Sequence, residues 1–202
     1  MRAILCSDRA VLRVTGEDAP KFLHGIVTNH VENLAPATAV FTALLTPQGK
    51  IVVDFFVVAV GDEEGGGFVL DAPATLADDL AKKLGFYKLR AKVEITPRPD
   101  LAVAIVLDQE PPADLGLVYL DPRHAGLGWR VVLPAEGAAA ALEAAGAKLV
   151  DAAVWQGRRI SVGIPEGGKD FIYGDTFPHE ADMDLLGGVD FHKGCFIGQE
   201  VV

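Results

Sequence analysis

The chain has 202 residues, of which 50% are hydrophobic and 23% are charged, and this composition excludes a wholly disordered protein. The formal net charge of −10 argues against a general binder of nucleic-acid backbones, because such proteins neutralise phosphates with cations. The two cysteines, Cys6 and Cys195, are too few for a disulfide framework or a dedicated zinc set, and they favour a reducing compartment.

The N-terminus carries several charges and has no long apolar segment typical of a signal peptide. The longest apolar run, 51–60, is interrupted by Asp54 and is too short to cross a bilayer. We therefore expect a cytoplasmic protein that contacts neither a membrane nor nucleic acid directly.

The first half of the chain predicts a sheet with accompanying helices. Branched and aromatic residues predict strands over 10–14, 39–45, 51–60 and 68–70. A tight turn over 46–49 joins two of these into a β-hairpin spanning 39–60, and the acidic, glycine-rich stretch 62–67 predicts a solvated turn. Helical spacing predicts helices over 17–29 and 73–84, the second ended by Gly85, and a shorter helical piece over 86–90.

The second half continues the pattern and then becomes irregular. Strands are predicted over 93–96, 102–107, 117–120 and 129–133, and helices over 135–145 and 152–160. From Gly163 onward the apolar periodicity is lost, and such loops on rigid scaffolds often carry function. Because strands and helices do not alternate strictly, we expect an α+β protein with mostly antiparallel sheets.

The segment 191–200 reads FHKGCFIGQE and holds the residues best suited to chemistry. A thiol reacts or binds metal as the thiolate, which the charge of Lys193 beside Cys195 would favour. Flanking glycines would let a ligand approach the backbone, and an amide and a carboxylate follow: Gly194, Gly198, Gln199 and Glu200. The alternative for Cys195 is a small buried side chain, and for Cys6 that state is favoured. No histidine has metal-ligand spacing with Cys195, so no metal site is predicted.

Residues 193–200 resemble the signature K-G-C-Y/F-x-G-Q-E of the YgfZ family, folate-binding proteins related to the glycine-cleavage T-protein, an aminomethyltransferase. Other stretches agree in order and spacing. Residues 16–30 resemble the family's opening, 45–54 resemble its L-x-P-x-G-R/K-x-x-x-D hairpin, and 177–180 resemble its L/F-P-x-E step. Residues 159–167 resemble the branch that contains mitochondrial and α-proteobacterial iron–sulfur assembly factors.

The resemblance implies a T-protein-like folate-binding fold of two packed α/β subdomains over residues 1–202, with an edge near 97–114. It implies tetrahydrofolate, or a one-carbon derivative, in a pocket between the subdomains, with Cys195 and Lys193 at its mouth. Family members continue into a C-terminal β-barrel, which we expect to be absent here. The implied function is an accessory factor for iron–sulfur cluster assembly or repair, with client or assembly proteins as partners and an indirect effect on tRNA modification.

Asp54 is a candidate acid facing folate, because an unpaired carboxylate in an apolar strand is costly. Its alternatives are an outward-facing strand position or a structural partnership with Arg90 or Lys92. The resemblance implies Cys195, Lys193 and Asp54 as candidate catalytic residues. It implies these candidate folate-binding residues: Gly194, Gly198, Gln199, Glu200, Arg159 and Glu180.

Two positions depart from the T-protein pattern. The hairpin carries one aspartate where the T-protein has a pair, and Ser161 stands where many relatives have a glutamate that grips the pterin ring. Both departures count against orthodox transferase chemistry. A folate-dependent one-carbon transferase with Asp54 as base is therefore the first alternative function, and a folate-independent thiol redox protein that pairs Cys195 with Cys6 is the second.

Overall fold

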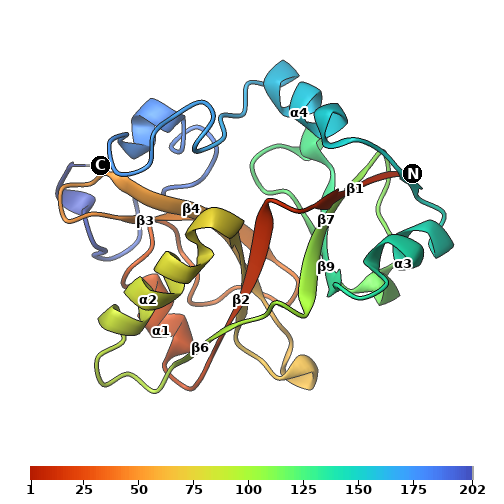
Figure 1. The fold of residues 1–202 in the computed structure, drawn as a ribbon. Coiled ribbons are helices and arrows are strands. Elements are labelled where there is room, and N and C mark those ends of the chain that lie inside the picture. Colours follow the sequence, from red (N-terminus) through yellow and green to blue (C-terminus); the bar gives the residue numbers. More distant parts are fainter. Residues whose placement is uncertain (202) are drawn as a thin grey trace.

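The computed structural model describes residues 1–201 and places the ten strands of this part of the chain in two five-stranded sheets (Figure 1). The first sheet has the order β3-β4-β5-β2-β6, and all its neighbouring strands are antiparallel. Its strands are β2 (Arg9–Thr15), β3 (Ala39–Leu45), β4 (Ile51–Ala59), β5 (Phe68–Pro73) and β6 (Glu94–Pro97).

The second sheet has the order β10-β1-β7-β9-β8. Its strands are β1 (Arg2–Cys6), β7 (Leu101–Leu107), β8 (Leu117–Leu120), β9 (Trp129–Pro134) and β10 (Lys148–Leu149). Only β1 and β10 pair in parallel among these strands, and the other pairs are antiparallel. The expected α+β class with mostly antiparallel sheets is thus confirmed.

Two short links join the sheets. Residues 7 and 8 connect β1 of the second sheet to β2 of the first, and residues 98–100 connect β6 to β7. Side chains alternate between the two faces of each strand. On one face of β4, Val53, Phe55 and Val57 belong to a core that also contains residues of the helices beside the first sheet. On the other face, Phe56 and Val58 belong to a core that also contains residues of the second sheet. Asp54 has the same parity as Phe56, so the fold directs its carboxylate toward the region between the sheets.

Three helices cover the outer faces of the sheets, and the fourth, α4, packs on the face of the second sheet that also meets the first. The apolar faces of α1 (Ala19–His24) and α2 (Ala77–Tyr87) pack in the core of the first sheet, and Figure 1 shows both beside its strands. The helix α3 (Ala138–Ala144) packs against the second sheet, and Trp155 of α4 (Ala152–Ser161) contacts β1 and β7.

The structure differs from the predicted elements at three places. The strands β1 and β10, which pair with each other, were not predicted, although the side chains of Ala3 and Ile4 are buried in β1. The predicted helix over 17–29 is only α1, since the chain leaves the helix at Gly25 and then pairs Val27 with Leu44.

The third difference is the end of the second helix, because α2 continues through Gly85 to Tyr87. Leu89 then ends it in the left-handed conformation, with φ 46°, and no separate helix forms over 86–90. Burial of Leu80 and Leu84 against the sheet offsets the cost of a glycine inside this helix.

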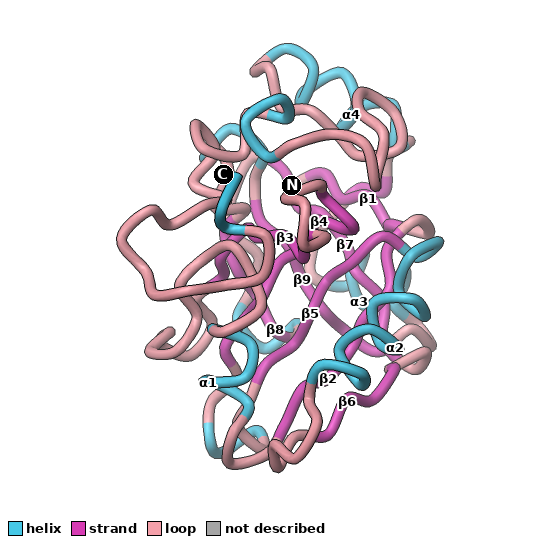
Figure 2. The backbone as a smooth tube through the Cα atoms, turned by 90° about the vertical axis from the view of Figure 1, so that its left-hand side faces the viewer, coloured by secondary structure: helices cyan, strands magenta, loops and turns pink. Residues whose placement is uncertain are grey.

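The tail beyond α4 is irregular, as expected, and contains the 3-10 turns η5 (Pro178–Ala181) and η6 (Gln199–Val201). It lies over the β3–β4 end of the first sheet, as Figure 2 also shows. Backbone hydrogen bonds fix it there: Ile51 donates to Thr176, and Gly174 donates to Ile51. The tail and the strand that carries Asp54 are therefore held together.

Candidate functional site

A cavity of about 420 Å³ lies where the two sheets, α4 and the tail meet. Its wall comes from the end of β1 and the link to β2, from β4, from α4 and from the loop 166–173. The polar and aromatic residues of the wall include Cys6, Asp8, Arg9, Asp54, Phe56, Arg123, Arg130, Trp155, Gln156, Glu166, Lys169 and Tyr173. Its volume falls within the range of about 300–1,000 Å³ that is typical of ligand pockets.

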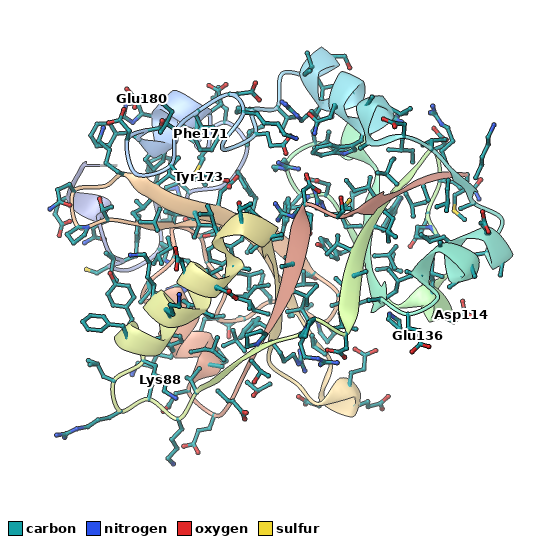
Figure 3. The ribbon with its side chains drawn as sticks, in the orientation of Figure 1. Lys88, Asp114, Glu136, Phe171, Tyr173 and Glu180 are labelled. Carbon is teal, nitrogen blue, oxygen red and sulfur yellow. The ribbon has the colours of Figure 1, made fainter. Side chains whose placement is uncertain are left out.

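Asp54 lies in this wall with only 7% of its surface exposed, so the predicted outward-facing alternative is wrong. Its hydrogen-bond partner is the hydroxyl of Tyr173, which donates to Asp54 Oδ1, and not the side chain of Arg90 or Lys92. Burial, reinforced by the neighbouring carboxylate, raises the pKa of Tyr173, so the phenol stays protonated and keeps donating. Figure 3 shows Tyr173 beside Phe171 on the tail, and the two rings meet edge to face at 5.4 Å.

A network of buried charges forms another part of the wall. Arg130 is 2% exposed and donates to Asp71 at 2.8 Å and to Asp121 at 2.9 Å. Arg9 also binds Asp71, and Arg123 also binds Asp121. Burial alone would raise the pKa of both carboxyl groups, but the arginines outweigh it and lower each pKa. The network joins β5 of the first sheet to β9 of the second.

Arg159 is buried behind the cavity rather than in its wall. It donates to Gln156 at 2.7 Å, to the carbonyl of Ile164 at 2.9 Å and to Asp170 at 2.6 Å, and it forms an ion pair with Glu166. Gln156 and Glu166 do line the cavity, so Arg159 fixes residues that a ligand would touch.

Ser161 lies outside the cavity wall. It is exposed at the end of α4, where its hydroxyl donates to the carbonyl of Arg158. A glutamate at position 161 would therefore not line this cavity, so the serine there does not deprive the cavity of a carboxylate. Glu166 is the acidic residue that follows α4 and lines the wall.

The ammonium of Lys193 is hydrogen-bonded to backbone carbonyls and not to the thiol. It donates to the carbonyls of His24, Val27 and Asn29 at 2.6, 2.5 and 3.0 Å, which uses all three of its N–H donors. Burial lowers the pKa of Lys193 to about 8, so the ammonium form still prevails at neutral pH. The lysine therefore fastens the signature segment to the loop that follows α1.

The thiol of Cys195 is exposed at the surface. Gly194 faces open space, whereas Gly198, with φ 83°, lies against the turn of the β3–β4 hairpin, where a Cβ would collide with the carbonyl of Thr46. The amide of Gln199 accepts a hydrogen bond from the Phe196 backbone at 3.1 Å. No α-helix opens at Phe196 within the described chain, and Glu200 is exposed in the turn η6.

The structure thus places the predicted site residues in two separate regions, at the cavity and in the tail that follows Tyr173. The cavity includes Asp54, but its wall contains no residue beyond Tyr173 in the described part of the chain. Glu180 caps the turn η5 by accepting from the Phe177 backbone at 2.8 Å, and Figure 3 places it at the outer side of the tail. Within residues 1–201, no group of three or more histidine, cysteine or acidic side chains is arranged to hold a metal ion.

Sequence reasoning missed several wall residues. Tyr173 had no local signal, because only the folding of the tail brings it to Asp54. Arg130 lies within the apolar strand β9, where buried charge is expensive, and that pattern is the signal that marks it. Arg9 begins β2 after two polar residues, so the sequence gives no such signal for it. Trp155 packs against β1 and β7 and also lines the cavity.

The fold is known from a solved structure. It matches the crystal structure of the glycine cleavage system aminomethyltransferase T from Bartonella henselae with a TM-score of 0.77 and 17% identity. The match covers 98% of this chain and 61% of that protein. The expected T-protein-like fold is therefore confirmed. No family model matches the sequence.

The sequence is also similar to curated proteins, which are named as iron–sulfur cluster assembly factors. The chain is 33% identical to the mitochondrial iron–sulfur cluster assembly factor IBA57 of Homo sapiens over 213 aligned residues, which cover 96% of the chain and 59% of the relative. It is 34% identical to the mitochondrial homologue of Mycosarcoma maydis and 32% identical to that of Mus musculus. The chain spans between 51% and 59% of the length of these relatives. They are homologues over nearly the whole of the chain.

These comparisons correct the expected location. The relatives are named as mitochondrial proteins, which points to the mitochondrion and overturns the predicted cytoplasmic placement. The prediction failed because composition and cysteine count report a reducing environment and not a particular compartment. None of the helices described over residues 1–201 is long and apolar enough to span a membrane.

Proposed function

We propose that this chain is the folate-binding part of an iron–sulfur cluster assembly or repair factor, with tetrahydrofolate or a one-carbon derivative held in the cavity between the sheets. The observation that carries the proposal is the cavity itself, with the buried carboxylate of Asp54 in its wall. Two comparisons support it: the relatives are named as iron–sulfur cluster assembly factors, and the fold is that of a T-protein.

The residues of the wall fit a folate. The pterin ring presents amino and N–H donors, which a carboxylate such as Asp54 accepts well. Phe56, Trp155 and Tyr173 supply aromatic surface against which a planar ring packs. When bound, tetrahydrofolate would supply a carrier for a one-carbon unit. The chain's own residues hold and orient it, and the hydroxyl of Tyr173 keeps Asp54 in place.

Cys195 has a separate role in this proposal. An exposed thiol can bind or react with a client protein or with an incoming cluster at the surface. Clusters generally need four thiolates, so one cysteine assists a transfer and does not store a cluster. The partners would be iron–sulfur client or assembly proteins, and any effect on tRNA modification would pass through such clients. The net charge of −10 supports an indirect effect over RNA binding.

We also propose that the chain comprises two subdomains that meet near residues 97–114. The passage from β6 to β7 at residues 98–100 supports this division. Because β1 belongs to the second sheet, the N-terminal strand would belong to the later subdomain.

Particular observations favour one of the two alternative functions, a one-carbon transferase, and count against the other, a thiol redox protein. A one-carbon transferase is favoured by the burial of Asp54 and its hydrogen bond from Tyr173, which hold a candidate base in one position. A thiol redox pair is disfavoured, because burial raises the pKa of Cys6 to about 12 and leaves little thiolate at neutral pH. Cys6 lines the cavity, whereas Cys195 is exposed and lies outside the wall.

Calorimetric titration with 5-formyltetrahydrofolate tests the folate proposal. We expect binding that Asp54→Asn weakens at least tenfold, and a matched exposed variant, Asp100→Asn, should bind like the unaltered protein. Absence of binding by folded, unaltered protein would overturn the proposal. For the thiol, Cys195→Ser should fail to restore iron–sulfur enzyme activity in cells that lack the factor, and full rescue would show that Cys195 is not needed.

A further inference from the structure

Three arginines surround one aromatic ring at the inner end of the cavity. The guanidinium carbons of Arg130, Arg123 and Arg9 lie 4.3, 4.8 and 5.6 Å from the ring centre of Phe56. All four residues belong to the cavity wall. Such a gathering of cations in the interior is costly unless each is paired.

The two aspartates of the network are fully engaged by their neighbours. Asp71 Oδ1 accepts from Arg9 at 2.6 Å, and its Oδ2 accepts from Arg130 and from the hydroxyl of Tyr119, both at 2.8 Å. Asp121 accepts from Nε and Nη2 of Arg123 and from Nε of Arg130. These carboxylates therefore have little capacity left to accept from anything else.

The arginines, by contrast, have donors left over. Arg9 donates through Nε and Nη2, Arg123 through Nε and Nη2, and Arg130 through Nε and Nη1. One terminal nitrogen of each guanidinium thus has no hydrogen bond within residues 1–201. None of the three is among the unpaired nitrogens that are sealed from solvent, so these donors reach the space of the cavity.

A further unused donor lies in the same wall. The indole nitrogen of Trp155 is buried and has no hydrogen-bond partner within residues 1–201, and the Arg130 guanidinium lies 5.8 Å from the centre of that ring. The other acidic residues of the wall lie elsewhere or are occupied. Asp54, which also faces Arg9, accepts from Tyr173, and Glu166 binds Lys169, Gln156 and Arg159. Asp8 lies in the link between β1 and β2.

We propose that Arg9, Arg123 and Arg130 form an oxyanion subsite at the inner end of this cavity. The inference rests on the proposed function and adds an orientation to it: the ligand turns an oxyanion toward the arginines and its N–H donors toward Asp54. The oxyanion is either a carboxylate of the folate-type ligand or a small free anion such as phosphate. Guanidinium groups suit both, because their N–H donors are fixed in a plane that matches such oxygens.

Fragments of folate separate the two ends of the cavity. The probes are p-aminobenzoyl-L-glutamate, which has carboxylates and no pterin, 6-methyltetrahydropterin, which has a pterin and no carboxylate, and inorganic phosphate. The variant is Arg123→Lys, which keeps the charge beside Asp121 but loses the planar array of donors. The matched control is Arg98→Lys, which alters an arginine paired at the surface with Asp100.

By calorimetry, we expect Arg123→Lys to bind p-aminobenzoyl-L-glutamate about tenfold more weakly, equivalent to about 1.4 kcal/mol, and to bind the pterin within a factor of two of the unaltered protein. Competition by phosphate against p-aminobenzoyl-L-glutamate would support the same subsite with a free anion as its ligand. Arg98→Lys should leave all affinities unchanged. If Arg123→Lys fails to fold, Arg9→Lys provides the same comparison.

Different failures separate the inference from the function on which it rests. Binding of the pterin with no binding of the carboxylate fragment or of phosphate would overturn the subsite and leave folate binding intact. Equal affinity of the variant and the unaltered protein for the carboxylate fragment would do the same. Failure of every probe and of 5-formyltetrahydrofolate to bind folded, unaltered protein would overturn both.

Discussion

Replacing Arg130 with methionine should destabilise the protein severely, because this side chain holds two buried aspartates at once. Its guanidinium is 2% exposed and lies 2.8 Å from Asp71 and 2.9 Å from Asp121. The substitution leaves each carboxylate with one arginine where it had two. Removal of one partner from a buried ion pair typically costs about 3–5 kcal/mol. In a chain of this size each kcal/mol lowers the melting temperature by roughly 2–4 °C, so the expected fall is about 6–20 °C.

Calorimetric or circular-dichroism melts measure this effect directly. Arg2→Met is the matched control, because Arg2 forms an exposed ion pair with Asp108, of a kind that contributes about 0–1 kcal/mol. A melting temperature for Arg130→Met within 2 °C of the unaltered protein would refute the reasoning. It would mean that solvent or side-chain movement satisfies the two aspartates without the arginine.

Three further outcomes follow from the site. Gly198→Ala should lower stability by roughly 1–3 kcal/mol in thermal melts, since Gly198 has φ 83° and no room for a Cβ beside Thr46, whereas Gly194→Ala should be neutral within about 0.5 kcal/mol. Lys193→Met should speed amide hydrogen exchange over 24–29 and 190–198, because three carbonyls lose their donor. Exchange at the unaltered rate over both segments would contradict the geometry. The melting temperature should stay constant above about pH 4 and fall below it. The pKa of Asp71 is lower in the folded protein than in the unfolded chain, so its carboxylate stabilises the fold above the ordinary carboxyl pKa, and this stability is lost as the pH falls through the pKa of the folded state. A melting temperature that stays flat down to pH 2 would be inconsistent with this.

Local pattern was enough to predict most of the sheet. The hairpin over 39–60 is rich in branched and aromatic residues and has a tight-turn composition between its strands, and the structure forms these strands over Ala39–Leu45 and Ile51–Ala59. The same pattern singled out Asp54, whose carboxylate breaks an apolar strand. The strand β1 escaped prediction because its pairing partners lie about 100 and 145 residues away, so nothing near it in the sequence signals a sheet.

The arrangement of the site depended on tertiary contacts that sequence does not encode locally. Lys193 and Cys195 are two residues apart, which suggests that the ammonium acts on the thiol, yet the ammonium reaches back about 165 residues to the loop after α1. Tyr173 reaches Asp54 from an irregular tail that has no periodicity to place it. Side-chain direction in loops is set by what the loop packs against, and spacing along the chain does not report it.

The position of β1 has a consequence for how the protein forms. All strands of the first sheet lie within residues 9–97, so that sheet can assemble as soon as this stretch has left the ribosome. The strand β1, although synthesised first, has no partner until β7 appears and is flanked on both sides only after β10 at residue 149. Contacts so distant in sequence slow folding, because a long loop must close before they form. The cavity, whose wall includes the end of β1, α4 and Tyr173 of the tail, can therefore be completed only after both sheets have formed.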